Sequence, residues 1–178
     1  MPTYDSIVDT VEENDMQYIS EILARKYGIF RNDLDNYVLK SHQKAVNAQK
    51  QGYFDNEIIP FEVFKDNQTF WFTKDENIVE NMPMEYLSQE APFFINDGII
   101  TRFNSAPIAD GAAAIMLMSE KRAVKEGFAP LAEIVATDTV GVSHGQMGLG
   151  TLEVIQSILK KSKMAIRDID LWECVEVP

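Results

Sequence analysis

Cysteine is almost absent from this sequence, and histidine is rare. The 178 residues contain one cysteine, Cys174, so an internal disulfide framework is excluded. The two histidines show no Cys/His spacing, and a metal site is not expected. No apolar run approaches the ~18 residues that span a bilayer. Residues 1–30 also lack the basic start, apolar stretch and cleavage site of a secretory signal. The sequence therefore predicts a cytoplasmic protein.

Basic residues are also scarce. The chain has 16 Lys and Arg against 28 Asp and Glu, a formal net charge of −12 at pH 7. Such a surface repels phosphate backbones and anionic lipid headgroups, because binding to either depends on clustered Lys and Arg. Nucleic-acid and membrane partners are therefore not expected. Apolar residues are plentiful, at 46% of the chain, which is enough to bury the core of one domain or two small ones.

The first third of the chain predicts two helices and a strand. Four apolar residues recur at a 3.6-residue period: Ile19, Ile22, Leu23 and Tyr27. Gly28 is a natural end for this helix. A second helix is expected to open with Asn32 as its cap and to end at Gly52. Residues 57–64 favour a strand, in which Pro60 indicates an edge or a bulge.

The rest of the chain alternates between loops and apolar segments. Residues 65–100 are loop-rich, with a short helix expected around Met84 to Ser88. The unbroken apolar run from Gly111 to Met118 predicts a fully buried element. Ser119 and Gly127 mark the start and end of a further helix.

The last third predicts a strand, a crossover helix and a second strand. Residues 131–137 are rich in apolar side chains, a glycine-rich turn follows, and residues 169–177 are again of strand type. The helix between them presents four apolar residues on one face: Leu152, Ile155, Ile158 and Leu159. A right-handed connection would make the two strands a parallel pair.

Several short motifs follow one another in a fixed order. They are Lys26-Tyr27-Gly28-Ile29, Ser41-His42-Gln43-Lys44-Ala45, Phe54-Asp55-Asn56-Glu57-Ile58, Ala91-Pro92-Phe93-Phe94, Asp110-Gly111-Ala112-Ala113-Ala114, Met147-Gly148-Leu149-Gly150 and Asp168-Ile169-Asp170-Leu171. Taken together in this order, the motifs resemble the thiolase family. The resemblance covers nearly the whole chain from about residue 14.

The resemblance implies an α/β fold, namely a partial thiolase fold with the loop domain and parts of the two mixed-sheet halves. Residues 1–118 would form the loop domain and the end of the N-terminal half, and residues 119–178 the start of the C-terminal half. The implied activity is acyl transfer between thioesters and coenzyme A. Thiolases use a nucleophilic cysteine, an activating histidine, a second cysteine as acid and base, and oxyanion donors.

None of the three catalytic residues has a counterpart in this chain, so no catalytic residue is assigned. The chain is expected to be an internal fragment that is inactive alone. By resemblance, Phe94, Ser105 and Met147 are candidate contacts for a substrate, with a coenzyme A thioester as the possible substrate and no bound cofactor.

Departures inside the matched region agree with this expectation. Residues 175–178 read Val-Glu-Val-Pro where thiolases read Asn-Glu-Ala-Phe, which replaces an oxyanion-site amide by an aliphatic group. The loss of one such donor costs about 2.7–4 kcal/mol of transition-state stabilisation. Residues 104–107 read Asn-Ser-Ala-Pro in place of Asn-x-Ser-Gly, where Ser105 can partly substitute for the lost hydroxyl. Gln17 replaces the usual glycine after Met16.

Individual residues also have plainer interpretations. One interpretation makes Cys174 a nucleophile with His42 or His144 as its base. The strand-like sequence around Cys174 favours the other interpretation, a buried and inert thiol. His42 resembles a packing residue of the family, and His144 stands in a glycine-rich turn where an exposed histidine is usual. The segment from Met147 to Gly150 fits either the lining of an acyl-CoA channel or a turn whose methionine side chain fills part of the core. It is not a dinucleotide fingerprint, because the third glycine and the later acidic residue are lacking.

Three hypotheses for function therefore remain. The first is a truncated thiolase-like acyltransferase without activity of its own. The second is one component of a split thiolase, completed by partner chains. The third is a non-catalytic module that binds coenzyme A or protein. In each case, unpaired strand edges and the apolar run 111–118 predict self-association or complementary thiolase chains as partners.

Overall fold

The computed structural model describes residues 8–9, 14–94, 96–107, 109 and 111–176. The chain divides into two units. Unit 1 is built mainly of Asn14–Pro107, and unit 2 mainly of Ile108–Glu176. No helix of the described residues is long and apolar enough to cross a membrane.

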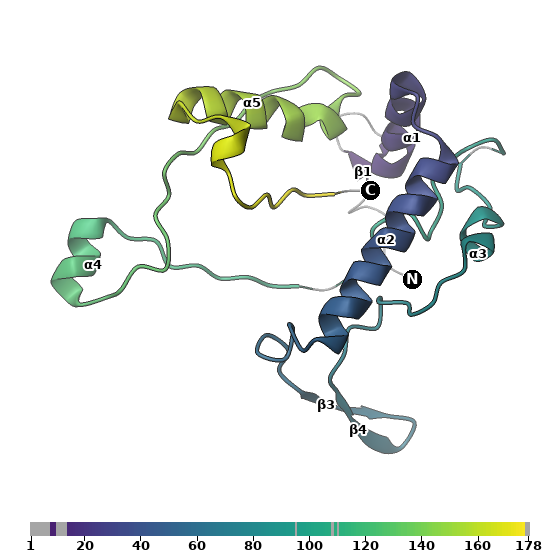
Figure 1. The fold of residues 1–178 in the computed structure, drawn as a ribbon, viewed down its shortest axis with the longest axis horizontal. Helices are drawn as coiled ribbons and strands as arrows, with labels where there is room; N and C mark the ends of the chain where they lie inside the picture. The colour runs from purple at the N-terminus through teal and green to yellow at the C-terminus, as the bar shows by residue number, and fades with distance from the viewer. Residues whose placement is uncertain (1–7, 10–13, 95, 108, 110, 177–178) are drawn as a thin grey trace. The chain divides into compact units, whose positions relative to one another are not determined.

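Two helices form the frame of unit 1, α1 (Met16–Tyr27) and the longer α2 (Arg31–Lys50) (Figure 1). Gly28 and Gly52 follow them with φ of 66° and 73°. This left-handed conformation is open to glycine without the steric penalty of a side chain. Both predicted helix ends are confirmed.

The buried face of α1 differs from the predicted stripe. It consists of Ile19, Glu21 and Ala24. Ile22 and Tyr27, both predicted to point inward, are exposed. The inner face of α1 therefore carries a carboxylate.

The start of α2 also differs from the prediction. Phe30 has an extended backbone and precedes the first turn. Its N–H donates to Asp33 Oδ2 at 2.9 Å, so a side chain inside the helix closes this end. The predicted capping role of Asn32 is wrong, because Asn32 lies one residue inside the helix that begins at Arg31.

A hairpin follows α2. Its strands β3 (Phe61–Lys65) and β4 (Gln68–Phe72) pair antiparallel, with the first residue of each opposite the last of the other. Asp66 and Asn67 form the two-residue turn with φ of 53° and 62°, as the twist of a tight hairpin requires. The predicted strand is therefore present but starts later, after Pro60.

The core of unit 1 lies between α1, α2, the short helix α3 (Met84–Ser88) and residues 99–101. The helix α3 was expected, and it packs against α2. The buried residues of unit 1 are Ile19, Ala24, Met82, Leu87 and Ile100, together with the polar residues Glu21, Asp35 and Thr101. A two-residue ladder, β1 (Val8–Asp9) with β2 (Asn14–Asp15), precedes α1.

Unit 2 contains α4 (Glu120–Glu126), α5 (Gly150–Ser162) and the short 3-10 helices η2 (Met147–Leu149) and η3 (Ile166–Asp168). The Ser119 hydroxyl accepts the Arg122 N–H at 3.3 Å, and Gly127 ends α4 with φ of 74°. The predicted start and end of this helix are confirmed. The helix predicted before the last strand is also present as α5.

The predicted strands of unit 2 are not formed in the described residues. Residues 131–137 and 169–176 have no strand pairing, and the run 111–118, predicted only as a buried element, has none either. The run 111–118 was expected to be buried, yet Ile115 is 83% exposed and Met116 is 79% exposed. A strand that is apolar on both faces needs neighbours in a sheet and cover on both sides, and the described part of unit 2 does not supply them. The predicted end of the last strand, Val177, lies outside the described residues.

Candidate functional site

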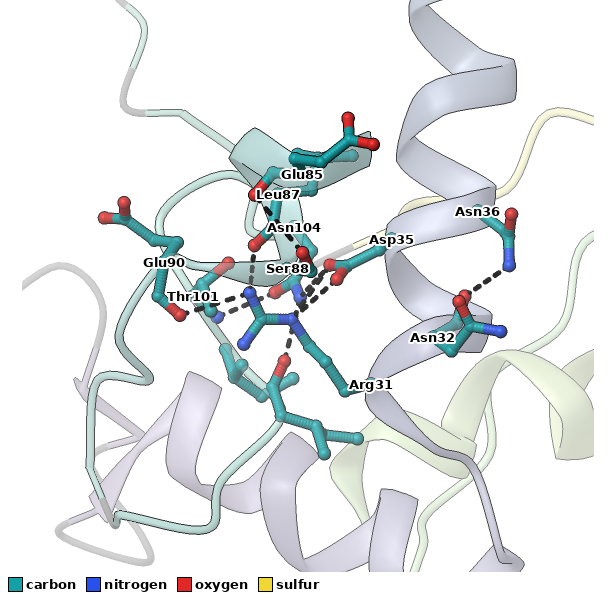
Figure 2. A network of polar contacts seen from close by, with 12 residues as sticks. Arg31, Asn32, Asp35, Asn36, Glu85, Leu87, Ser88, Glu90, Thr101 and Asn104 are labelled. Atoms are coloured by element: carbon teal, nitrogen blue, oxygen red, sulfur yellow. Dashed lines mark hydrogen bonds and ion pairs between the residues drawn. The ribbon is translucent and has the colours of Figure 1, made fainter. Parts of the chain in front are cut away.

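A network of buried polar groups joins the elements of unit 1 around Arg31 (Figure 2). Arg31 opens α2, and its Nε donates to Asp35 Oδ1 and Oδ2, at 2.9 Å each. Its Nη2 donates to the carbonyl oxygens of Leu87 and Glu90, the latter at 3.2 Å. Asp35 is only 2% exposed, so the pair is largely removed from water. Arg31 thereby ties the start of α2 to the end of α3.

A second buried carboxylate, Glu21 of α1, is also 2% exposed. Its Oε1 and Oε2 accept the N–H of Ile99 at 2.9 and 3.0 Å, and Oε2 also accepts the N–H of Ile100 at 3.0 Å. Among the described residues, Glu21 forms an ion pair with Arg25, whose Nε lies 3.9 Å from Oε1 on a half-exposed side chain. Two consecutive backbone amides therefore provide the main compensation for this buried charge.

Asn104 closes the turn that starts at Ile99. Its Oδ1 accepts the Thr101 N–H, and its Nδ2 donates to the Ile99 carbonyl, both at 2.8 Å. Nδ2 also lies 3.5 Å from Asp35 Oδ1, at the long limit of a hydrogen bond (Figure 2). Side chains from α1 and from the turn itself thus fix residues 99–104.

Two hydroxyls beside this turn are buried without a hydrogen-bond partner among the described residues. They belong to Thr101 and Ser105. Leaving a polar group in this state costs about 1–3 kcal/mol, which sets these two hydroxyls apart from the satisfied groups around them. Ser105, predicted to contact a substrate, directly follows the closing residue Asn104.

Phe94, the second predicted substrate contact, also belongs to unit 1. Its ring meets that of Tyr18 edge to face, with centroids 5.8 Å apart, and that of Phe93 at 6.0 Å. The N–H of Phe93 donates to the Ile100 carbonyl at 2.9 Å. The backbone next to Phe94 is therefore joined to the same turn that precedes Ser105.

Met147, the third predicted contact, lies in unit 2 at the start of η2 and is partly exposed. The structure thus connects Phe94 and Ser105 through one turn, and it describes Met147 within a separate unit. The assignment of all three as substrate contacts stays a prediction.

The sequence pattern did not identify Glu21, Arg31 or Asp35 as members of a network. The one available signal was Glu21 itself, because a carboxylate among the apolar residues of a helix indicates either exposure or a specific partner.

The cysteine and histidines lie in different settings. Cys174 is exposed, so the expectation of a buried thiol is wrong. Residues 171–176 lack the sheet neighbours that would bury it. His42 lies on α2, where its Nδ1 accepts the Val79 N–H at 3.3 Å, in keeping with a packing role. His144 is exposed in a turn, as expected.

No group of three or more His, Cys, Asp or Glu side chains among the described residues is arranged to hold a metal ion.

Unit 2 has its own polar anchor at Asp138. The Ser157 hydroxyl donates to Asp138 Oδ2 at 2.5 Å, and Lys161 Nζ donates to Oδ1 at 3.3 Å and to the Thr137 carbonyl at 2.6 Å. The hydrogen bond from Ser157 is the main reason that the pKa of Asp138 lies below its ordinary value, and Lys161 adds to the effect. This anchor attaches α5 to the segment before the glycine-rich turn.

Comparisons with known proteins agree with one another. Residues 1–121 match the family described as Thiolase, N-terminal domain. A probable acetyl-CoA acyltransferase of Staphylococcus aureus (strain COL) is 37% identical over 174 residues, which are 97% of this chain and 44% of that protein. The chain therefore spans less than half the length of this relative.

Two solved structures are similar to this chain along most of its length. The acetyl-CoA acetyltransferase of Bacillus anthracis gives a TM-score of 0.84 at 33% identity, covering 94% of this chain and 43% of the other. Human mitochondrial 3-ketoacyl-CoA thiolase in complex with CoA gives a TM-score of 0.82 at 35% identity, covering 94% and 42%.

Proposed function

This chain belongs to the thiolase family and has part of the α/β thiolase fold, and we propose that it holds a coenzyme A thioester without catalysing acyl transfer by itself. The thioester specificity is supported by relatives named for acetyl-CoA and 3-ketoacyl-CoA substrates. The inactivity rests on the absence, from these 178 residues, of counterparts to the two cysteines and the histidine on which thiolase chemistry depends.

The observation that carries the proposed inactivity is the setting of Cys174. It is the single cysteine of the chain and lies exposed in a segment without regular structure. A thiol becomes an efficient nucleophile when a base, a cation or a helix N-terminus stabilises its thiolate. No helix begins within residues 169–176, so Cys174 has no helix N-terminus of its own segment to activate it.

A turnover assay tests this proposal directly. The purified 178-residue chain is incubated with acetoacetyl-CoA and coenzyme A, and thiolysis is followed by the loss of acetoacetyl-CoA. We expect the rate to equal that of buffer. Mass spectrometry after incubation with acetyl-CoA should show no acetyl group on Cys174. Turnover that disappears in the Cys174→Ser variant would contradict the proposal.

A second candidate function is that of one component in a split thiolase. The exposed apolar residues of unit 2 favour it, since Ile115, Met116 and Leu117 follow one another in a segment without regular secondary structure. Leu131 and Val135 are exposed in a later segment. Monomeric proteins rarely present contiguous apolar surface of this kind. A chain with the complementary strands would cover these residues, whereas self-association would cover them with a second copy.

Co-expression distinguishes these partners. A polypeptide that carries the catalytic cysteines and histidine of a thiolase is produced with this chain, and the mixture is tested for co-purification and thiolysis. Activity on mixing supports the split enzyme, and its absence together with a concentration-dependent mass in light scattering supports self-association. We also propose a cytoplasmic location, which cell fractionation tests.

A further inference from the structure

We propose that Glu21 is a positioning residue, which fixes the turn at residues 99–104 and thereby presents both Phe94 and Ser105 to a coenzyme A thioester. The inference rests on the proposed function, because it concerns the same binding surface. Glu21 itself is buried and is not assigned a contact with the ligand.

The first step of the argument concerns the buried charge. A carboxylate on the inner face of a helix costs free energy unless hydrogen bonds replace its water. Glu21 receives these bonds from Ile99 and Ile100, at 2.9–3.0 Å. Both residues are distant in sequence, so the bonds serve to hold one segment against another. An apolar residue at position 21 would fill the core without holding the turn in register.

The second step follows the bonds outward from Ile99 and Ile100. Ile99 gives its N–H to Glu21 and accepts Asn104 Nδ2 at its carbonyl, at 2.8 Å. Ile100 likewise gives its N–H to Glu21 and accepts the Phe93 N–H at its carbonyl, at 2.9 Å. Each isoleucine therefore links the carboxylate to a residue adjacent to a predicted contact: Asn104 precedes Ser105, and Phe93 precedes Phe94.

The third step concerns the polar groups of this turn that have no hydrogen-bond partner among the described residues. The hydroxyls of Thr101 and Ser105 are buried and have no partner among the described residues, whereas the side chain of Asn104 and the N–H groups of Ile99 and Ile100 have theirs. A hydroxyl can donate to the carbonyl of a thioester or an amide, and a coenzyme A thioester contains both. The Ser105 hydroxyl is buried, so a thioester carbonyl reaches it only after the side chains over it move aside, and a turn that stays fixed limits the entropic cost of that step.

The Glu21→Gln variant tests the inference. It keeps the shape of the side chain but places an NH2 donor against backbone N–H groups that need an acceptor. The matched control is Glu90→Gln, because Glu90 contacts the same turn through Arg102 at 3.1 Å but lies near the surface. Amide hydrogen exchange reports the turn in the absence of ligand, and calorimetry with acetyl-CoA reports binding.

We expect E21Q to accelerate exchange of the Ile99, Ile100 and Thr101 amides and to weaken acetyl-CoA binding, each by at least about tenfold, as the loss of hydrogen bonds to a charged group implies. E90Q should stay within roughly twofold, as expected for a surface ion pair. Should E21Q fail to fold by circular dichroism, Glu21→Asp replaces it, since it keeps the charge but shortens the reach to both amides.

A comparison of a triple with a double variant separates positioning from general stability. If Glu21 acts through Ser105 and Phe94, the triple variant E21Q/S105A/F94A binds acetyl-CoA no more weakly than S105A/F94A. Additive losses would overturn the inference, and so would unchanged amide exchange in E21Q. Absence of acetyl-CoA binding by the unmodified chain would instead refute the proposed function, and amide exchange would still decide whether Glu21 holds the turn.

Discussion

Replacing Arg31 by methionine removes the guanidinium that joins α2 to α3 while keeping an apolar side chain of similar length. The substitution leaves Asp35 buried with Asn104 Nδ2 at 3.5 Å as its remaining described partner. It also removes the donor to the carbonyls of Leu87 and Glu90. Unit 1 would then contain a buried charge, and the Leu87 and Glu90 carbonyls would lose the Arg31 donor, although the Leu87 carbonyl keeps the Glu90 N–H at 3.2 Å.

The magnitude follows from this burial. Removing one partner of a buried ion pair costs about 3–5 kcal/mol, because the other charge stays uncompensated. Typical domains are stable by only about 5–15 kcal/mol, so the loss is a large fraction of the total. With a urea dependence of about 2 kcal/mol/M, the unfolding midpoint of unit 1 should fall by roughly 2 M.

The assay is urea unfolding followed by far-ultraviolet circular dichroism, which reports the loss of helix. The matched control is Arg122→Met, since Arg122 and Glu126 form a pair of the same i,i+4 spacing, also at 2.9 Å, on an exposed face. That control should cost only about 0.3–0.5 kcal/mol. A further variant, Arg31→Met with Asp35→Leu, should recover part of the loss because it removes the buried charge. If R31M costs no more than R122M, the reasoning is refuted.

Three further predictions concern unit 2. The folded-state pKa of Asp138 lies below the ordinary value of 3.8. The ionised carboxylate therefore stabilises unit 2 fully above about pH 4, and this stabilisation is lost as the pH falls through the folded-state pKa. The D138N substitution should reduce this acid dependence in thermal melts. Gly127→Ala should cost about 1–2 kcal/mol in chemical denaturation, because φ of 74° forces a side chain into the left-handed region; an unchanged midpoint would contradict this. Ile115→Lys with Met116→Lys should lower the mass measured by light scattering, since both side chains are exposed in the single chain, and should abolish any rise of the melting temperature with protein concentration.

Local signals in the sequence predicted the parts of the fold that depend on neighbours along the chain. Gly28, Gly52 and Gly127 end helices because a positive φ is a property of a single residue. Ser119 caps α4 for a similarly local reason, since its hydroxyl meets an amide three residues later. The family resemblance then gave the fold class, which periodicity did not.

The buried network could not be predicted in this way. Glu21 is buried because Ile99, 78 residues later, supplies its hydrogen bonds, and no periodicity within α1 contains that information. Asp35 is similar, because its burial accompanies the contacts of Arg31 with the distant carbonyls of Leu87 and Glu90. Conversely, the burial predicted for the apolar run 111–118 is wrong, because burial also requires a neighbour to cover the run, and composition does not supply one.

The exposed run around Ile115 also has a consequence inside a cell. Extended apolar segments are the features that chaperone holdases bind and that proteases cleave, and both act on a protein whose covering surface is missing. We therefore expect that a chain able to cover that segment, when it is co-produced, raises the steady-state amount of this polypeptide.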